Sequence, residues 1–447
     1  MVRIFNSARE FVFFLALFII AVVSTVLVYS LRLNGPPIRS DGLGYFSYLP
    51  ASIVYRDLGL NSFIASYASY YHESIGDNWY GAYIYEPTGN YVNKYPIGVA
   101  LLGLPLYVLA HLGVVVSSNL SGVPADGFSH PLYHIANNLT AILYAIAGLV
   151  ILKRMLETYF SQTAVYLTLI AITIGTNLFH YFTYDAAFSH AYSFFLISLF
   201  LYQTIAWYQR PTTSKTLLLG LVLGLITLVR QSNLLVGSFF MLYGLSSLTN
   251  LKELPKKLRF FLKNYDHVLL LLMTSLVVAA IQFWYWYSVT GKFFVYTYRG
   301  EGFNFLDPQL FNVLFSVRKG LFFWSPVLLL AIPGIALIRN KVKGFAVAAV
   351  LYFLINAYVV SCWWMWSYGG SFGMRALTET FPFLAFFIAA TIDSVISTHR
   401  KSTLFWLVAI IIGLSAYSLF LMVQYWRGII PFDETTFELF IRAFQIK

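Results

Sequence analysis

The chain of 447 residues contains one cysteine, Cys362, and few charged residues. A single cysteine excludes a disulfide framework and any zinc site built from several cysteines. Charged residues make up only 11% of the chain, whereas hydrophobic residues make up 59% and aromatic residues 19%. With a mean hydropathy of +0.71, such a chain has too little polar surface for a soluble domain. The composition therefore predicts an all-α polytopic membrane protein.

Acidic residues are scarcer than basic ones, 18 against 29, which leaves a formal net charge of +11. The basic residues gather at the ends of hydrophobic runs, in residues 3–9, 153–154, 210–215, 252–263, 339–343 and 400–401. Because positively charged loops stay in the cytoplasm, we expect these segments on that side. The whole positive excess then lies there, so it reports orientation in an inner or plasma membrane and predicts no nucleic-acid partner.

Hydrophobic runs separated by charged residues predict about eleven transmembrane helices. The expected helices cover residues 11–31, 134–152, 162–180, 186–207, 216–229, 234–249, 267–288, 321–338, 344–361, 377–396 and 403–424. The first run resembles the apolar region of a signal peptide, but it is long enough to span and no clear cleavage site follows. We therefore expect a retained helix.

The run of residues 97–116 is also long enough to cross, but a further crossing would move Lys153 and Arg154 to the outer side. We therefore expect a helix embedded in the outer leaflet, where the surrounding protein satisfies its backbone around Pro105 and His111. An ordinary crossing with a local violation of the charge rule remains the alternative.

The long connections, residues 32–96 and 289–320, both fall on the predicted extracytoplasmic side. The first should carry juxtamembrane helices. We divide the chain into a transmembrane module of residues 1–250 and a C-terminal set of helices, 251–447, that ends in a short outer tail. Functional residues are therefore expected on the outer side.

Asp41 stands in the segment SDGLGYFSYLP, directly after the first hydrophobic run. A carboxylate there can stay ionised and still reach a lipid headgroup, although a cap for the helix that follows is the alternative. Tyr45 lies in the same segment. Lys94, in KYPIG, opens the embedded helix and can equally be a lysine that extends to the membrane interface.

Asp185 and His190 lie five residues apart at a turn between two predicted crossings, in FTYDAAFSHAYSFF. The alternatives are a helix cap for Asp185 and a histidine hydrogen-bonded within the bundle. Arg230 interrupts an apolar hairpin, and an ionisable residue at such depth is a functional candidate. Its alternative is a structural pair with an aspartate such as Asp185.

Glu301 and Arg375 occupy outer loops rich in aromatic residues and glycine, YTYRGEGFNFLDP and WSYGGSFGMR. Glycine lets the backbone approach a ligand closely, and tryptophan and tyrosine faces suit sugar rings. Aromatic residues at a membrane interface give the same composition, so both interpretations stay open.

In layout, the first 235 residues or so resemble the GT-C class of membrane glycosyltransferases, especially the mannosyltransferase and aminoarabinose-transferase branch that uses polyprenyl-phosphate sugars. The resemblance implies that Asp41 is the catalytic acid-base, that Asp185 supports it, and that Lys94 and Arg230 bind the lipid phosphate. Many members carry paired acidic residues in the first loop, whereas Gly42 follows Asp41 here.

The implied reaction transfers a sugar from a polyprenyl phosphate to a lipid, glycan or protein acceptor, with inversion at the anomeric carbon. Arg375 and Tyr45 would join the substrate-binding residues. Asp185, His190 and Glu301 would orient Asp41, hold the acceptor or bind a divalent cation (Mg²⁺, Mn²⁺ or Zn²⁺), although no spacing demands a metal. The alternatives are a transporter or flippase of a lipid-linked saccharide and a catalytically silent homologue that binds a partner.

Overall fold

The computed structural model describes residues 7–31, 37–247 and 253–445, which are mostly helical. Seven helical segments in this part of the chain are long and apolar enough to cross a membrane. They are α1 (Ala8–Leu31), α4 (Gly98–Ser121), α5 (Pro131–Glu157), α8 (His190–Gln209), α12 (Tyr265–Thr290), α17 (Phe381–Ser397) with the 3₁₀ turn before it, and α18 (Lys401–Trp426). The fold has the all-α character of a membrane protein.

Four shorter apolar helical segments accompany them: α6 (Gln162–Ile174), α9 (Thr213–Val229), residues Pro326–Asn340 and α16 (Phe345–Ser361). The predicted number of eleven crossings stays a prediction. The expected cytoplasmic residues Arg3 and Lys252 lie outside the described part of the chain.

Three of the predicted helices are interrupted. The run 321–338 divides into α14 (Leu321–Trp324), the 3₁₀ turn η3 (Pro326–Leu330), α15 (Ala331–Leu337) and the 3₁₀ turn η4 (Ile338–Asn340), because Pro326 supplies no backbone N–H. In the run 162–180, α6 stops at Ile174. A separate helix, α7 (Leu178–Thr183), begins after Gly175.

The run 234–249 is the third, and the last two of its residues lie outside the described part of the chain. It contains the end of the 3₁₀ turn η2 (Gln231–Val236) and the short α10 (Gly237–Leu242). Arg230, just before η2, has extended backbone (φ −160°).

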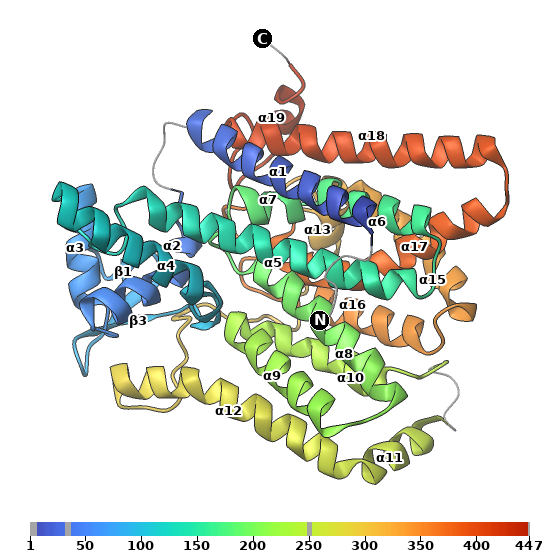
Figure 1. The fold of residues 1–447 in the computed structure, drawn as a ribbon, viewed down its shortest axis with the longest axis horizontal. Coiled ribbons are helices and arrows are strands. Elements are labelled where there is room, and N and C mark those ends of the chain that lie inside the picture. The colour runs from blue at the N-terminus through green and yellow to red at the C-terminus, as the bar shows by residue number, and fades with distance from the viewer. Residues whose placement is uncertain (1–6, 32–36, 248–252, 446–447) are drawn as a thin grey trace.

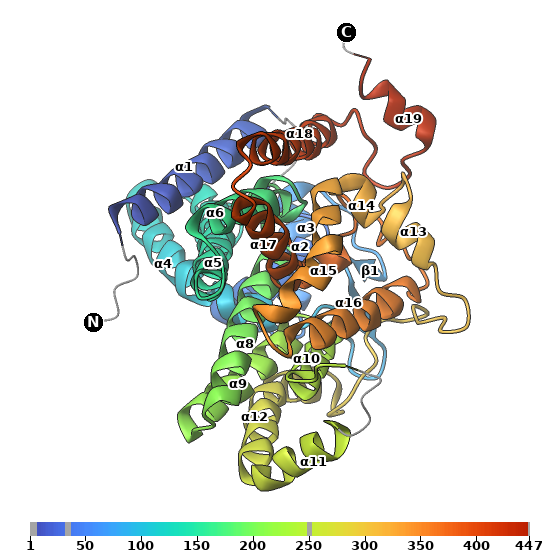
Figure 2. The same ribbon diagram turned by 90° about the vertical axis from the view of Figure 1, so that its right-hand side faces the viewer.

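The core passes through both predicted modules. One buried hydrophobic cluster runs from Phe14 in α1 to Ala443 near the end of the chain. Figure 2 shows α5, α8 and α17 in the centre of the bundle, with α1, α12 and α18 at its edge. At Gly334 the backbone of α15 approaches Phe387 of α17 so closely that a Cβ atom would lie 1.9 Å from the Phe387 carbonyl oxygen. The division at residue 250 is therefore not a division of the core.

A small layer covers one end of the bundle, which we call the sheet end (Figure 1). It contains α2 (Asp41–Pro50), the π-helical turn η1 (Ala51–Tyr55) and α3 (Asn61–Tyr71). An antiparallel sheet follows, with strands β1 (Asn78–Trp79), β2 (Ala82–Tyr85) and β3 (Asn90–Asn93), in which Ala82 lies opposite Asn93. The loop was expected to carry helices, but the sheet was not predicted, because its strands are only two to four residues long.

The packing of α4 bears on whether it crosses. The Tyr144 hydroxyl of α5 donates to the Leu102 carbonyl, and His111 hydrogen-bonds Tyr133 near the start of α5. Helix α4 therefore begins beside the middle of α5 and runs antiparallel to it toward the sheet end. After α4, the ring of Phe128 packs on Phe63 of α3, with 5.8 Å between ring centroids. These contacts support a helix confined to one side, and the embedded position stays a prediction.

Three further helices are α11 (Glu253–Lys263), α13 (Leu310–Phe315) and α19 (Phe437–Arg442), and the 3₁₀ turn η5 (Arg375–Thr380) precedes α17. The last turn of α12 lies beside the sheet, because the Val289 carbonyl accepts hydrogen bonds from Thr88 and Asn90. Helix α11 precedes the first turn of α12 and therefore lies at the opposite end of the bundle.

A candidate active site of paired charges

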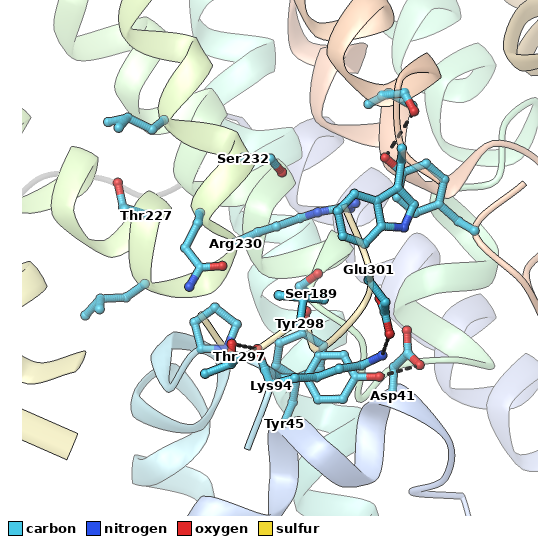
Figure 3. A pocket seen from close by; sticks show the side chains of 18 of the residues that line it. Asp41, Tyr45, Lys94, Ser189, Thr227, Arg230, Ser232, Thr297, Tyr298 and Glu301 are labelled. Carbon is cyan, nitrogen blue, oxygen red and sulfur yellow. Dashed lines mark hydrogen bonds and ion pairs between the residues drawn. The ribbon is translucent and has the colours of Figure 1, made fainter. Parts of the chain in front are cut away.

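A cavity of about 810 Å³ opens between the bundle and the sheet-end layer. Seven of the eight predicted site residues line it: Asp41, Tyr45, Lys94, His190, Arg230, Glu301 and Arg375. They come from α2, the end of β3, α8, the end of α9, the loop after α12 and η5, so the fold brings together segments that are far apart in the sequence. Figure 3 shows Lys94 and Glu301 beside Asp41, with Arg230 projecting toward the cavity from a separate segment.

Asp41 is the first residue of α2, and both of its carboxylate oxygens have partners. The Tyr95 hydroxyl donates to Oδ1 at 2.7 Å, and the Arg375 guanidinium lies 2.7 Å from Oδ2. Burial raises the pKa of Asp41, but Arg375 and the hydrogen bond from Tyr95 together bring it below its usual value. The carboxylate is therefore ionised, and its partners are distant side chains rather than the backbone N–H groups that a helix cap would bind.

Glycine sets the position of Asp41. A Cβ atom at Gly42 would lie 2.5 Å from the Ala187 side chain, and one at Gly44 would lie 2.3 Å from the Tyr95 ring. Both distances are too short for any real side chain. The two glycines thus allow α2 to press against the turn before α8 and against the tyrosine that holds Asp41.

Lys94 follows β3, and its ammonium lies 3.1 Å from the Glu301 carboxylate. It also lies over the rings of Tyr95 and Tyr298, at 5.4 and 5.5 Å. The Thr297 hydroxyl donates to the Lys94 carbonyl at 3.1 Å, which fixes the loop after α12 to the strand end. Lys94 therefore lines the cavity with its ammonium paired to a carboxylate.

Arg230 and His190 share one buried carboxylate, that of Glu379. The Arg230 guanidinium lies 3.4 Å and His190 Nδ1 3.1 Å from Glu379 Oε1. Glu379 was not predicted as a site residue, although it is the only acidic residue in the apolar stretch of residues 376–392. Its side chain is buried, and it takes the place of the aspartate in the alternative interpretation, since Arg230 pairs with Glu379 and Asp185 pairs with Arg39. The interpretation of His190 as a histidine hydrogen-bonded within the bundle fits this geometry.

Asp185 is the one predicted site residue that does not line the cavity. Its carboxylate lies 2.8 Å from His180 Nε2 and 3.5 Å from the Arg39 guanidinium. The Trp426 indole N–H donates to the other ring nitrogen of His180 at 2.9 Å. Burial raises the pKa of Asp185, but His180, Arg39 and Arg375 together bring it below the usual value. Asp185 thus fixes the turn before α8, and its carboxylate binds His180 and Arg39 outside the cavity.

A shared divalent-cation site of Asp185, His190 and Glu301 is not assembled. Among the described residues, no group of three or more His, Cys, Asp and Glu side chains is arranged to hold a metal ion. Each of the three has a separate partner, namely His180, Glu379 and Lys94.

The cavity has a charged part and an apolar part. Its three lysine and arginine residues are each paired with a carboxylate, as Lys94–Glu301, Arg230–Glu379 and Arg375–Asp41. Aromatic residues line the wall around these pairs: Tyr298, Phe303, Trp363, Trp364 and Tyr368. The apolar part lies between η2 and α12 and is lined by Leu234, Leu235, Phe283 and Trp286. Such a cavity can hold an anionic group, a polar ring and an apolar chain together.

The fold and the cavity define an all-α membrane protein with an ion-paired site at the sheet end. No protein-family model matches the chain, and no curated protein matches it. The function is therefore argued from the site.

Proposed function

We propose that the protein is an integral-membrane glycosyltransferase that transfers a sugar from a polyprenyl-phosphate donor to an acceptor on the extracytoplasmic side of the membrane. The observation that carries this proposal is the convergence of an ionised carboxylate, Asp41, and three cations, each held by a carboxylate, in a cavity with an apolar branch. The resemblance of the first 235 residues or so to GT-C transferases also supports it.

The donor phosphate would bind Lys94, Arg230 and Arg375. Charge-assisted hydrogen bonds from fixed cations are the strongest that proteins form with phosphate, and they stabilise the charge that develops on a departing phosphate. The polyprenyl chain would follow the apolar branch of the cavity. Leu234, which lines this branch, is 52% exposed and would face the lipid.

In the transfer step, the acceptor oxygen forms a bond to the anomeric carbon while the bond from that carbon to the phosphate oxygen breaks. Asp41 takes the hydroxyl proton as general base, and the lipid phosphate leaves with the bonding electrons. A single displacement of this kind inverts the anomeric centre. Binding of the phosphate would also draw Arg375 away from Asp41, so that the pKa of Asp41 rises and the carboxylate becomes a stronger base.

A transporter of a lipid-linked saccharide is the second candidate. The observation that favours it is that both oxygens of Asp41 are already engaged, by Tyr95 and Arg375. A transporter only has to bind its substrate, so its site needs no carboxylate that is free to accept a proton.

Transfer from radiolabelled polyprenyl-phosphate sugars by the purified protein in lipid bilayers tests the proposal. Asp41→Asn should reduce transfer by about 10² to 10⁴ fold, the contribution of a general base, and should leave folding and donor binding intact. Asp77→Asn, which changes an exposed aspartate before β1, is the matched control. Equal transfer by the Asp41 variant would overturn the role of Asp41, whereas donor translocation without turnover would favour the transporter.

A further inference from the structure

Helix α11 (Glu253–Lys263) presents three different faces. Lys257 and Phe260 face the bundle, Leu254, Leu258 and Leu262 form an apolar stripe, and Lys256, Arg259 and Lys263 form a basic stripe. The spacing of four residues between the leucines places them on one side of the helix. Each face therefore requires a different environment: the protein, an apolar phase or a negatively charged surface.

The face toward the bundle is firmly fixed. The Lys257 ammonium donates to the Tyr208 hydroxyl at 2.6 Å and to the Tyr243 carbonyl. The Phe260 ring stacks on Tyr208 with 5.2 Å between centroids. These contacts leave α11 no freedom to rotate its leucines toward the protein.

The apolar stripe is unpartnered within the described protein. Leu254, Leu258 and Leu262 are 51%, 60% and 62% exposed. At the start of α12, Tyr265 and Leu269 are also exposed, by 68% and 57%. Because α12 is long and apolar enough to span the membrane, an exposed apolar stripe on the helix directly before it suits contact with lipid.

The basic stripe is also free of ion pairs. Lys256, Arg259 and Lys263 are exposed, and none of them lies within ion-pair distance of a carboxylate in the described residues. A cationic stripe beside an apolar one matches a bilayer surface that carries anionic headgroups. Figure 1 shows α11 meeting the start of α12 at a bend, at the edge of the bundle.

We infer that α11 is an interfacial helix that binds anionic phospholipid in the leaflet at the end of the bundle opposite the sheet end. The leucines enter the boundary between headgroups and acyl chains, and the basic stripe contacts headgroup phosphates. The contact does not depend on the proposed transferase activity, since it lies at the far end of α12 from the cavity.

Spin labels in the full-length protein test the depth of the helix. On a Cys362→Ser background, Leu258→Cys and Arg259→Cys place labels at adjacent residues on different stripes. In bilayers that contain phosphatidylglycerol, the label at residue 258 should collide with oxygen more than with a water-soluble nickel chelate, and the label at residue 259 should show the reverse. Equal access of the chelate to both labels would overturn the inference.

Retained lipid tests the charge recognition. After detergent extraction from these bilayers, native mass spectrometry should find phosphatidylglycerol on the protein. Arg259→Gln with Lys263→Gln should weaken this retention on the order of tenfold. The matched control, Arg400→Gln with Lys401→Gln, removes two exposed basic residues elsewhere in the chain and should leave retention unchanged. The inference would be overturned if both variants lost the lipid equally or if neither lost it. It would also be overturned if the label at residue 258 were shielded only in a dimer of this chain.

Discussion

At the scale of single residues, the chemistry of the cavity depends on how each charge is paired. Asp41 is held between Tyr95 and Arg375, so it is ionised but only weakly basic in the unliganded protein. Lys94 and Arg230 are similarly held by Glu301 and Glu379. A phosphate that enters the cavity must therefore compete with carboxylates already in place. This competition links donor binding to the basicity of Asp41.

Removal of Arg375 should raise the pKa of Asp41. In Arg375→Gln the neighbouring positive charge is lost while burial remains, so the carboxyl should titrate at higher pH than in the native chain. Infrared difference spectra of the carboxylate band, recorded against Asp41→Asn over an acid titration, measure this shift. Arg427→Gln, at an exposed arginine, is the control.

The same pair has a consequence for stability. Because the pKa of Asp41 is lowered on folding, its contribution to stability is full above the unfolded value of about 3.9 and is lost as the pH falls through the folded value. Arg375→Gln should lose less stability in acid than the native chain does. An unshifted titration in the variant would show that Arg375 does not control Asp41.

Residue types and their local context were enough to predict the seven candidates that line the cavity, because a charge in an apolar or aromatic setting is conspicuous. They were not enough to predict the pairs. Glu379 is found 149 residues from Arg230 along the chain, and Tyr95 is 54 residues from Asp41. Only the fold brings these partners together. Asp185 was predicted to belong to the site but does not line the cavity, because it binds His180, a histidine five residues before it in the sequence.

At the scale of elements, the site depends on close contact between the start of α4 and the end of α9. A Cβ atom at Gly98 would lie 2.4 Å from the backbone carbon of Leu228. This contact brings the segment that carries Lys94 beside the segment that carries Arg230. Neither backbone can yield easily, because each belongs to a packed helix.

We expect Gly98→Ala to destabilise the protein by about 1–3 kcal/mol, the usual cost of overpacking, and to weaken donor binding. Thermal unfolding in detergent gives the first quantity and binding of polyprenyl phosphate the second. Gly413→Ala is the matched control, because nothing lies within 4 Å of the added Cβ in α18. The control should be neutral or stabilising by up to ~1 kcal/mol, and equal effects of the two changes would contradict the argument.

A buried amine joins the loop that precedes Arg375 to the chain after α18. Lys319 is 1% exposed, and its Nζ donates to the carbonyls of Ser371 and Phe432, the latter at 2.6 Å. Burial lowers the pKa of Lys319 to about 7, although Asp433 opposes this shift and the positive charges of Arg375 and Arg318 add to it. A neutral amine has two N–H donors, which match the two carbonyls.

The lowered pKa predicts a pH-dependent stability. Between about 7 and the ordinary lysine value of 10.5, the unfolded chain holds a proton that the folded chain lacks. Stability should therefore rise with pH across this interval. Thermal unfolding of the native chain should show this rise, and Lys319→Met should reduce it. Parallel pH profiles for the two proteins would contradict the assignment.

Continuous apolar helices were predictable from the sequence, as α5, α8, α12 and α18 show. The interrupted helices were not predictable, because hydropathy does not indicate where a helix breaks. Pro326 and Gly175 end regular helix inside runs that remain apolar throughout. The strands at the sheet end are too short for an alternating pattern to be recognised.

At the scale of the whole molecule, the cavity lies between the two modules predicted from the sequence. Asp41, Lys94, His190 and Arg230 come from the first module, and Glu301 and Arg375 from the second. The two modules also share a core cluster. The site is therefore a property of the complete bundle, and a fragment that ends at residue 250 would lack part of each of its three ion pairs.

The orientation of α4 decides the overall topology. The contact of Leu102 with Tyr144 places the start of α4 beside the middle of α5, and the contact of Phe128 with Phe63 returns the chain after α4 to the sheet-end layer, although the helix is long enough to cross. On a Cys362→Ser background, Ser74→Cys before α4 and Val123→Cys after it should therefore react with a membrane-impermeant maleimide from the same side. Ser402→Cys, at the start of α18, should react only from the opposite side. Labelling of residues 74 and 123 from opposite sides would mean that α4 crosses. The chain from α5 onward would then be inverted relative to the sheet-end layer, which the packing of Phe128 against α3 does not permit.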